Sequence, residues 1–181
     1  MAMTLITNNT HTGDSDSTSS FTSSIDGTYK LYIFKFYDIN PSDVSPYFTF
    51  NGSIDGGSNY NVAKTTTFFL ARHQEDDSQA SLAYQAAEDL AQGTGAQRLA
   101  FTLANYADSS AAGQLFLFNP SSTTYVKHFY STVNYMFTQA SPHTMNTFIG
   151  GYFNTTDNID AVQFAMSAGT MDGVIKMYGV G

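Results

Sequence analysis

Apolar and polar residues alternate in short segments along most of the chain. Residues 46–54 (PYFTFNGSI) place Phe48, Phe50 and Ile54 on one face at a period of two, which is typical of a half-buried strand. Segments of this kind recur, and loops rich in Gly, Asn, Ser and Pro separate them. The pattern predicts strands at residues 21–25, 29–38, 46–54, 65–73, 97–103, 113–118, 123–137, 147–153, 159–165 and 173–178.

Roughly nine or ten short strands joined by loops indicate an all-β chain folded as a β-sandwich, for which we expect a jelly-roll-like topology. The composition agrees with this fold class. The chain has 15 Phe, 12 Tyr and no Trp, and aromatic residues favour pleated, half-buried surfaces. A chain of 181 residues is also long enough to bury a core without disulfides or a structural metal.

One segment departs from the period of two. Residues 79–90 (QASLAYQAAEDL) are rich in Ala and place Leu82, Ala86 and Leu90 on one stripe of a helix. Ser78 precedes the segment as a plausible N-cap. We therefore expect one short surface helix that covers an open end of the sandwich.

The first twenty residues (MAMTLITNNTHTGDSDSTSS) are mostly polar and show no period. Such a segment cannot form a core of its own, so it is either a disordered tail or an arm that becomes ordered on a neighbouring subunit. We favour an extended N-terminal arm over residues 1–20, anchored by Met3, Leu5 and Ile6. The β-sandwich domain then comprises residues 21–181.

The charge content limits the classes of partner. The formal net charge is −8, only 12% of residues are charged, and the chain has only seven Lys and Arg in total. Without a basic patch to neutralise phosphates, we expect no nucleic-acid partner and no binding to an anionic membrane surface. The start of the chain lacks the basic and long apolar regions of a signal peptide. The absence of Cys rules out a thiol nucleophile.

Few residues suggest catalytic chemistry. Gly13-Asp14-Ser15 has the composition of some esterase nucleophile motifs, but its flanks are polar and no base follows at the expected spacing. The four histidines are scattered without the spacing of metal ligands: His11, His73, His128 and His143. We expect no catalytic residue and no cofactor.

Acidic residues offer two weaker alternatives. Residues 75–77 (EDD) form a cluster, but the ordered loop of a calcium site is absent, so solvated charge explains them best and we expect no metal site. Asp160 and Asp172 could serve as a glycosidase carboxylate pair only if folding brought them together.

Several strand-and-turn segments carry a family resemblance: residues 53–61 (SIDGGSNYN), 65–68 (TTTF), 118–129 (FNPSSTTYVKHF) and 175–179 (IKMYG). In content and order they resemble a family of virion structural proteins of tailed bacteriophages that is common among aquatic phages. The resemblance covers roughly residues 25–179. It implies a β-sandwich displayed on the head or tail of the particle, in a virion assembled in the host cytoplasm, and it carries no catalytic residues.

Three functions remain open. The first is a head decoration (cement) protein, a homo-oligomer such as a trimer, that binds the major capsid protein. The second is a tail component, a fibre tip or a receptor-binding module, whose exposed rings Tyr60, Tyr106 and Tyr152 would stack on host glycans. The third is a glycan hydrolase that uses Asp160 and Asp172. We favour the non-enzymatic decoration protein.

Overall fold

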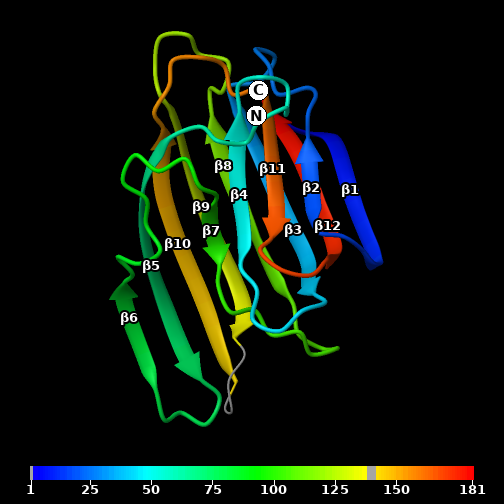
Figure 1. The fold of residues 1–181 in the computed structure, drawn as a ribbon, viewed down its shortest axis with the longest axis vertical. Helices are drawn as coiled ribbons and strands as arrows, with labels where there is room; N and C mark the ends of the chain where they lie inside the picture. The colour runs from blue at the N-terminus through cyan, green and yellow to red at the C-terminus, as the bar shows by residue number, and fades with distance from the viewer. Residues whose placement is uncertain (1, 138–141) are drawn as a thin grey trace.

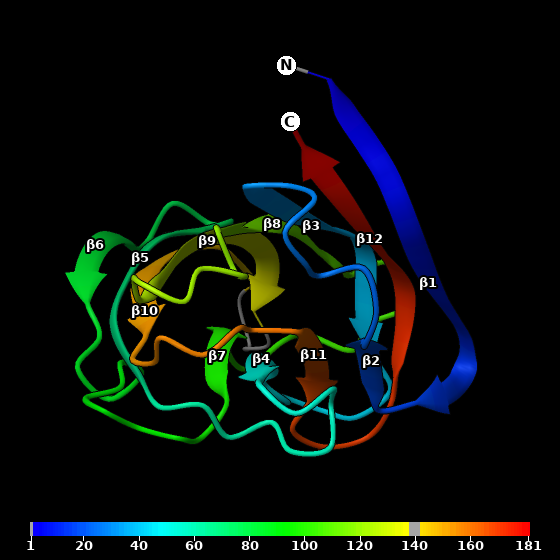
Figure 2. The same ribbon diagram turned by 90° about the horizontal axis from the view of Figure 1, so that it is seen from above.

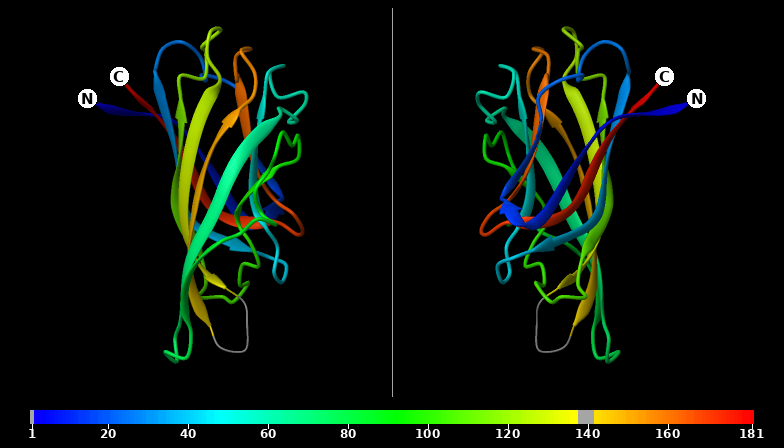
Figure 3. Two further views of the ribbon diagram at one scale, coloured as in Figure 1. Left: turned by 90° about the vertical axis from the view of Figure 1, so that its left-hand side faces the viewer. Right: turned by 90° about the vertical axis from the view of Figure 1, so that its right-hand side faces the viewer.

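The computed structural model describes residues 2–137 and 142–181, and these form two antiparallel sheets packed as two layers (Figures 1 and 3). The larger sheet has eight strands in the order β1-β12-β3-β8-β9-β10-β5-β6, and the smaller has four in the order β2-β11-β4-β7. The strands are β1 (Met3–Asp16), β2 (Thr18–Phe21), β3 (Leu31–Pro41), β4 (Phe48–Ser53), β5 (Lys64–Gln74), β6 (Ala80–Tyr84), β7 (Gln97–Ala100), β8 (Ala111–Phe118), β9 (Lys127–Phe137), β10 (His143–Phe153), β11 (Ala161–Met166) and β12 (Met171–Val180). The predicted all-β sandwich is confirmed.

Consecutive strands repeatedly cross from one sheet to the other. β1, β3, β8 and β12 lie in the larger sheet, and their chain neighbours β2, β4, β7 and β11 lie in the smaller one. Two hairpins, β5–β6 and β9–β10, stay within the larger sheet and widen it beyond the smaller one. As a result, the smaller sheet covers only part of the inner face of the larger sheet (Figure 2).

The alternation of the sequence explains the layers. Along β9 every second side chain is buried, from Lys127 through Phe129, Ser131 and Val133 to Tyr135, and the residues between them face solvent. β4 differs because all of its residues are buried. It lies between β11 and β7 in the smaller sheet, so this central strand is covered on both faces.

Phe164 of β11 is the centre of the core. Its ring lies within 6.4 Å of five other phenylalanine rings, centroid to centroid, contributed by both sheets: Phe21, Phe34, Phe36, Phe48 and Phe50. Most of these pairs meet edge to face or tilted, the geometry that the aromatic quadrupole favours. Interlocking rings therefore fill the space between the layers.

The helix predicted over residues 79–90 is wrong, and the described residues contain no helix at all. Its first half is the strand β6, which pairs with Phe69–His73 of β5, and the remainder forms turns. Leu82, which was expected to face the core, has 72% of its surface exposed. Helix propensity is a weak preference, and pairing with the open edge of β5 supplies hydrogen bonds that outweigh it.

In the segment predicted as an arm, residues 3–16 and 18–21 form strands that pair with strands of their own chain. β1 pairs antiparallel with β12, and a bulge lies between Leu5 and Thr7; β2 pairs with β11 in the smaller sheet. A polar, threonine-rich segment can join a sheet edge because strand pairing satisfies the backbone and needs no core. The N-terminal part of β1 and the end of β12 extend beyond the two layers (Figure 2).

Candidate functional site

The outer face of the larger sheet carries a belt of large apolar side chains. Strand register aligns Leu5 with Tyr178, Tyr178 with Ile33, Ile33 with Phe116, and Phe116 with Tyr130. After a diagonal step of two residues, a second register line joins Phe148, Phe69 and Tyr84. We call this set the apolar belt; it takes one residue from each strand of the eight-stranded sheet: Leu5, Tyr178, Ile33, Phe116, Tyr130, Phe148, Phe69 and Tyr84.

Two stacked ring pairs form the middle of the apolar belt. The rings of Phe116 and Tyr130 lie 4.5 Å apart at an interplanar angle of 18°, and those of Phe69 and Phe148 lie 5.0 Å apart at 15°. Tyr130 is 46% exposed and Phe148 37%. Contiguous exposed apolar surface of this kind is typical of interaction sites.

A slot interrupts the apolar belt at Gly150. This residue is the register partner of Tyr130 on one side and of Thr67 on the other, and Phe148 lies two residues away in the same strand. A Cβ atom at position 150 would meet only Thr67 Oγ1, at 3.6 Å. The resulting depression has a volume of about 370 Å³ and is lined only by uncharged residues. We call it the aromatic slot.

A second depression continues along β9 and β10 on the same face. It has a volume of about 230 Å³, and its lining combines Asn134, Thr144 and Asn146 with Ala71, Arg72 and His73 of β5. Asn134 Nδ2 donates to Thr144 Oγ1 at 3.0 Å, and Asn146 Nδ2 donates to Thr132 Oγ1 at 3.4 Å. We call it the amide depression. Its hydrogen-bonding groups therefore lie next to the apolar surface of the slot.

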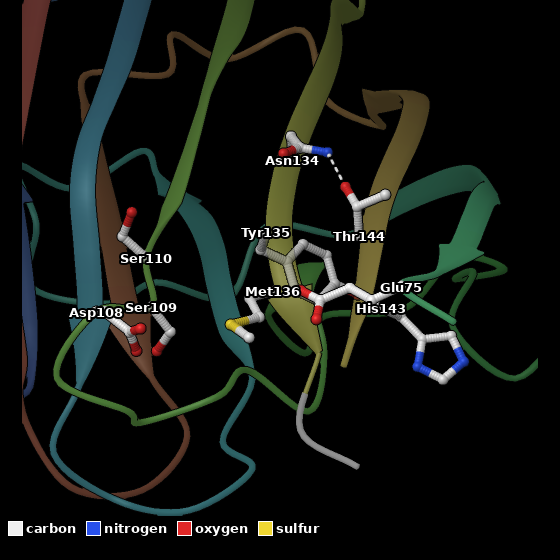
Figure 4. Close-up of a pocket in the computed structure, with 9 residues that line it drawn as sticks. All are labelled: Glu75, Asp108, Ser109, Ser110, Asn134, Tyr135, Met136, His143 and Thr144. Atoms are coloured by element: carbon white, nitrogen blue, oxygen red, sulfur yellow. Dashed lines mark hydrogen bonds between the residues drawn. The ribbon is translucent and has the colours of Figure 1, made fainter. Parts of the chain in front are cut away.

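A third depression, of about 290 Å³, contains the acidic residues Glu75 and Asp108 near His143 (Figure 4). The imidazole of His143 points away from both carboxyl groups (Figure 4), and it packs against the ring of Phe137. No hydrogen bond or ion pair joins these three residues in the part of the chain that the structure describes. The pocket therefore does not assemble an acid and a base.

The motif around Ser15 does not form a nucleophile with a base. Ser15 Oγ donates to Asp16 Oδ2 at 3.2 Å, and the same carboxylate oxygen lies 3.1 Å from His11 Nδ1. Nucleophilic activation needs the serine hydroxyl to contact the histidine. Here both residues contact Asp16, so the arrangement spans the irregularity of β1 between His11 and Asp16.

Asp160 and Asp172 lie at opposite ends of β11. Asp160 precedes the strand and accepts a hydrogen bond from Gly56 N at 3.0 Å, whereas Asp172 belongs to β12, beyond the other end. The six residues of β11 span about 20 Å, and a glycosidase pair needs carboxyl groups within about 10 Å of each other. Folding therefore does not bring these two carboxylates together.

Two buried lysines flank Phe153 where the larger sheet begins at β5 and β9. Phe153 pairs in register with both Lys64 and Lys127, and neither lysine is exposed. Lys64 Nζ donates to Asn51 Oδ1 at 2.8 Å, to Gly95 O at 2.7 Å and to Val62 O at 3.1 Å. Burial lowers the pKa of Lys64 to about 8. The ammonium group joins β4 to two loop segments and does not reach solvent.

Lys127 shows the same effect in a weaker form. Burial lowers the pKa of Lys127, and the negative charge of Asp157 opposes that shift. Its Nζ donates to the carbonyl oxygen of Thr155 at 3.1 Å.

Within residues 2–137 and 142–181 no group of three or more His, Cys, Asp or Glu side chains could hold a metal ion. No helix among these residues is long and apolar enough to cross a membrane.

The three tyrosines predicted as exposed contacts are not brought together. Tyr106 is 44% exposed in the loop after β7, whereas Tyr60, in the loop after β4, is half-buried and its buried hydroxyl has no hydrogen-bond partner. β4 and β7 are antiparallel neighbours, so the two loops lie at opposite ends of the sandwich. Tyr152 is half-buried on β10, beside His128 at 5.9 Å between ring centroids.

The three residues predicted to anchor the arm lie in β1 at the free edge of the larger sheet. Met3 and Leu5 are 47% and 50% exposed, and Ile6 is half-buried against the core. Among the described strands β1 pairs only with β12, so its other edge is open. Leu5 also begins the apolar belt.

The apolar belt itself was missed by the sequence interpretation. The available signal was the occurrence of aromatic residues on both phases of a strand, as at Phe68 and Phe69, of which Phe68 is fully buried and Phe69 is 39% exposed. A half-buried strand needs apolar residues on one phase only. The second phase therefore indicates an outer face that is also apolar.

No family model matches this chain, and neither a curated protein nor a solved structure is significantly similar to it.

Proposed function

We propose that this chain is a non-enzymatic structural protein of a phage virion, a head decoration protein that binds the shell through the free edge of β1. The motif resemblance of residues 25–179 favours a virion setting. The observation that carries the mode of attachment is the open edge of β1, which runs from Met3 to Asp16. Such an edge offers unpaired backbone N–H and C=O groups to another chain.

The composition of β1 supports this use of the edge. Proteins that avoid edge-to-edge pairing place Lys or Pro on their edge strands, and β1 contains neither. Residues 3–12 also contain no Asp, Glu, Lys or Arg. Added strands are therefore not repelled by charge, and the exposed Met3 and Leu5 add apolar area to the backbone hydrogen bonds.

We also infer that the sandwich is a jelly roll. The order β1-β12-β3-β8 in one sheet and β2-β11-β4-β7 in the other supports this topology, because each chain-neighbour pair is divided between the sheets. The hairpins β5–β6 and β9–β10 are then insertions that widen one sheet. Jelly rolls are found in viral capsid proteins and in lectins, so the topology suits a decoration protein and a glycan-binding tail component alike.

The test of attachment uses shells and the purified chain. Leu5→Lys places a charge on the β1 edge and should abolish binding to assembled shells. The matched control is Leu82→Lys, which changes a 72% exposed residue on β6 at the opposite edge of the same sheet and should bind normally. Equal binding by both variants and the wild type would refute attachment through β1.

Copy number tests the place in the particle. A decoration protein should be present in hundreds of copies per virion and should bind assembled shells in preference to free shell subunits. Quantitative mass spectrometry of purified virions provides the count. A result of a few dozen copies or fewer would exclude the decoration function.

The apolar belt favours a second candidate, a tail component that contacts host glycans. Its rings, unlike the dispersed trio Tyr60, Tyr106 and Tyr152, lie on one face and include open ring surface at Tyr130. A receptor-binding module would block adsorption of the phage to cells when added as purified protein. A decoration protein would leave adsorption unchanged.

A further inference from the structure

We propose that the aromatic slot at Gly150 binds the ring of a neutral sugar. Binding there would be independent of the β1 edge, because the slot lies on the face of the sheet at β9 and β10. A glycan contact at this position is therefore compatible with either place in the particle.

The geometry of the slot leaves room for one ring. Phe116 and Tyr130 stack at 4.5 Å, close to the roughly 4.8 Å spacing between adjacent strands. Phe118, also on β8, lies 5.7 Å from Tyr130 on that same side. The next position in the stack is occupied by Gly150 on β10, which has no side chain, so one face of Tyr130 is open. A ring placed above Gly150 would pack against that open face of Tyr130.

Gly150 is not required by the fold. Its φ is not in the left-handed region, and an added Cβ would have only one neighbour within 4 Å. Gly151 contrasts with it, because a Cβ there would lie 2.6 Å from the carbonyl oxygen of Thr65. Close packing thus accounts for Gly151, while Gly150 serves to keep the surface of the slot open.

The chemistry of the lining fits a sugar in particular. A pyranose ring has an apolar C–H face, which packs on an aromatic ring, and hydroxyls around its rim. The slot offers hydrogen-bond partners to such sugar hydroxyls. Thr67 Oγ1 donates to Gly150 O at 3.3 Å and can still accept a hydrogen bond. Thr132 Oγ1 accepts a hydrogen bond from Asn146 and can still donate one. No charged residue lines the slot, which matches a neutral ligand.

The amide depression supplies the continuation of the site. Asn134, Asn146 and Thr144 line it on β9 and β10, beyond Phe148 as seen from the slot, and Arg72 and His73 of β5 complete the lining. Asparagine side chains offer both donors and acceptors, the combination that sugar hydroxyls need. A glycan chain lying along these strands would place one ring in the slot and the hydroxyls of a neighbouring unit over the amides.

The test is isothermal titration calorimetry against neutral oligosaccharides of glucose, galactose, mannose and N-acetylglucosamine, with sialylated and sulfated glycans for comparison. We expect at least one neutral oligosaccharide to bind with a Kd below about 1 mM. Tyr130→Ala removes the stacking face and should weaken binding about tenfold. Gly150→Leu fills the slot and should abolish binding.

The control is Tyr178→Ala, which removes another ring of the apolar belt on β12, in the same register line but three strands from Tyr130. It should bind the sugar as the wild type does. Thermal melts of all variants verify folding, and because Tyr130→Ala and Gly150→Leu change the slot in opposite ways, a folding defect in one does not remove the test.

Three outcomes would overturn the proposal. The first is the absence of binding by any neutral oligosaccharide at millimolar concentration, and the second is unchanged affinity in Gly150→Leu. The third is self-association that Gly150→Leu abolishes without any sugar binding, which would assign the slot to a second copy of the chain. Shell binding through β1 is measured separately, so failure here leaves that proposal intact.

Discussion

The ring of Phe164 on β11 lies 5.1 Å from that of Phe36 on β3, so one residue of the smaller sheet meets the larger sheet at the centre of the core. Both side chains are buried, and Phe164 is fully so. The two layers are therefore held together by interlocking aromatic rings around a single position.

Replacing Phe164 with Ala should strongly destabilise the fold. The substitution leaves a cavity between the sheets, and such changes cost about 3–5 kcal/mol. The control Phe148→Ala removes a ring that is 37% exposed and loses at most about 1.5 kcal/mol of stacking. Guanidinium unfolding followed by circular dichroism gives both values; similar losses for the two variants would contradict the central role of Phe164.

Stability should depend on the protonation of Lys64. Burial lowers its pKa in the folded chain from 10.5 to about 8, so between these values the unfolded chain binds more protons. Stability therefore rises with pH across that window, by up to about 1.4 kcal/mol per pH unit from this group.

The variant Lys64→Met isolates that effect. The difference in unfolding free energy between wild type and Lys64→Met, measured from pH 7 to pH 9.5, should move in favour of the wild type once the pH passes 8. All other titrating groups are common to both proteins. A difference that stays constant with pH would show that the ammonium group is not penalised by burial.

Adjacent glycines on β10 should respond in opposite ways to alanine. Gly151→Ala forces its Cβ to within 2.6 Å of Thr65 O and 2.7 Å of Thr66 Cγ2, and overpacking of this kind costs about 1–3 kcal/mol. Gly150→Ala makes only one ordinary contact, at 3.6 Å to Thr67 Oγ1, and should be neutral or stabilise the fold by up to about 1 kcal/mol. Melting temperatures of the two variants provide the comparison, and a Gly150→Ala variant as unstable as Gly151→Ala would mean that the slot is not open.

Thr147 should contribute a hydrogen bond that joins the sheets. Its Oγ1 lies 2.6 Å from Leu99 O of β7, and the side chain is fully buried. Thr147→Val preserves the shape but leaves that carbonyl unsatisfied, at a cost of about 1–3 kcal/mol. Thr144→Val, an exposed position on the same strand, should change stability by less than about 0.5 kcal/mol. Chemical unfolding of both variants distinguishes a buried bond from a strand preference, since only the latter would affect the two alike.

The sequence predicted the fold class because alternation is a local signal. Phe48 and Phe50 at a period of two predict a strand at residues 46–54, and β4 occupies Phe48–Ser53. Turn chemistry was equally local: Ser122 N donates to Asn119 O at 3.0 Å in the segment that separates the predicted strands at residues 113–118 and 123–137. Both signals depend only on residues within one short window.

The errors arose where distant residues decide the structure. Ala80–Tyr84 has helix propensity, but the edge of β5 determines that it is a strand. β1 has little hydrophobic pattern, and its partner β12 is at the other end of the chain. Neither pairing can be seen in a local window, because strand pairing is a property of two segments.

The candidate site was hidden for the same reason. The apolar belt exists only after register aligns one residue from each of eight strands, and Gly150 is significant only because Tyr130 lies beside it. From the sequence, tyrosines in loops are expected to be exposed. Tyr60 does not meet this expectation. A Cβ at Gly57 would lie 2.7 Å from the Tyr60 hydroxyl, so the loop itself packs against that side chain.

The pairing of β1 with β12 also orders events during synthesis. β1 leaves the ribosome long before β12, and β2 likewise precedes its partner β11. Neither early strand can pair until almost the whole domain has been translated, and contacts of such long sequence separation form slowly. The two sheets therefore cannot close before β11 and β12 have been translated, and until then β1 is an unpaired strand whose residues 3–12 contain no Asp, Glu, Lys or Arg.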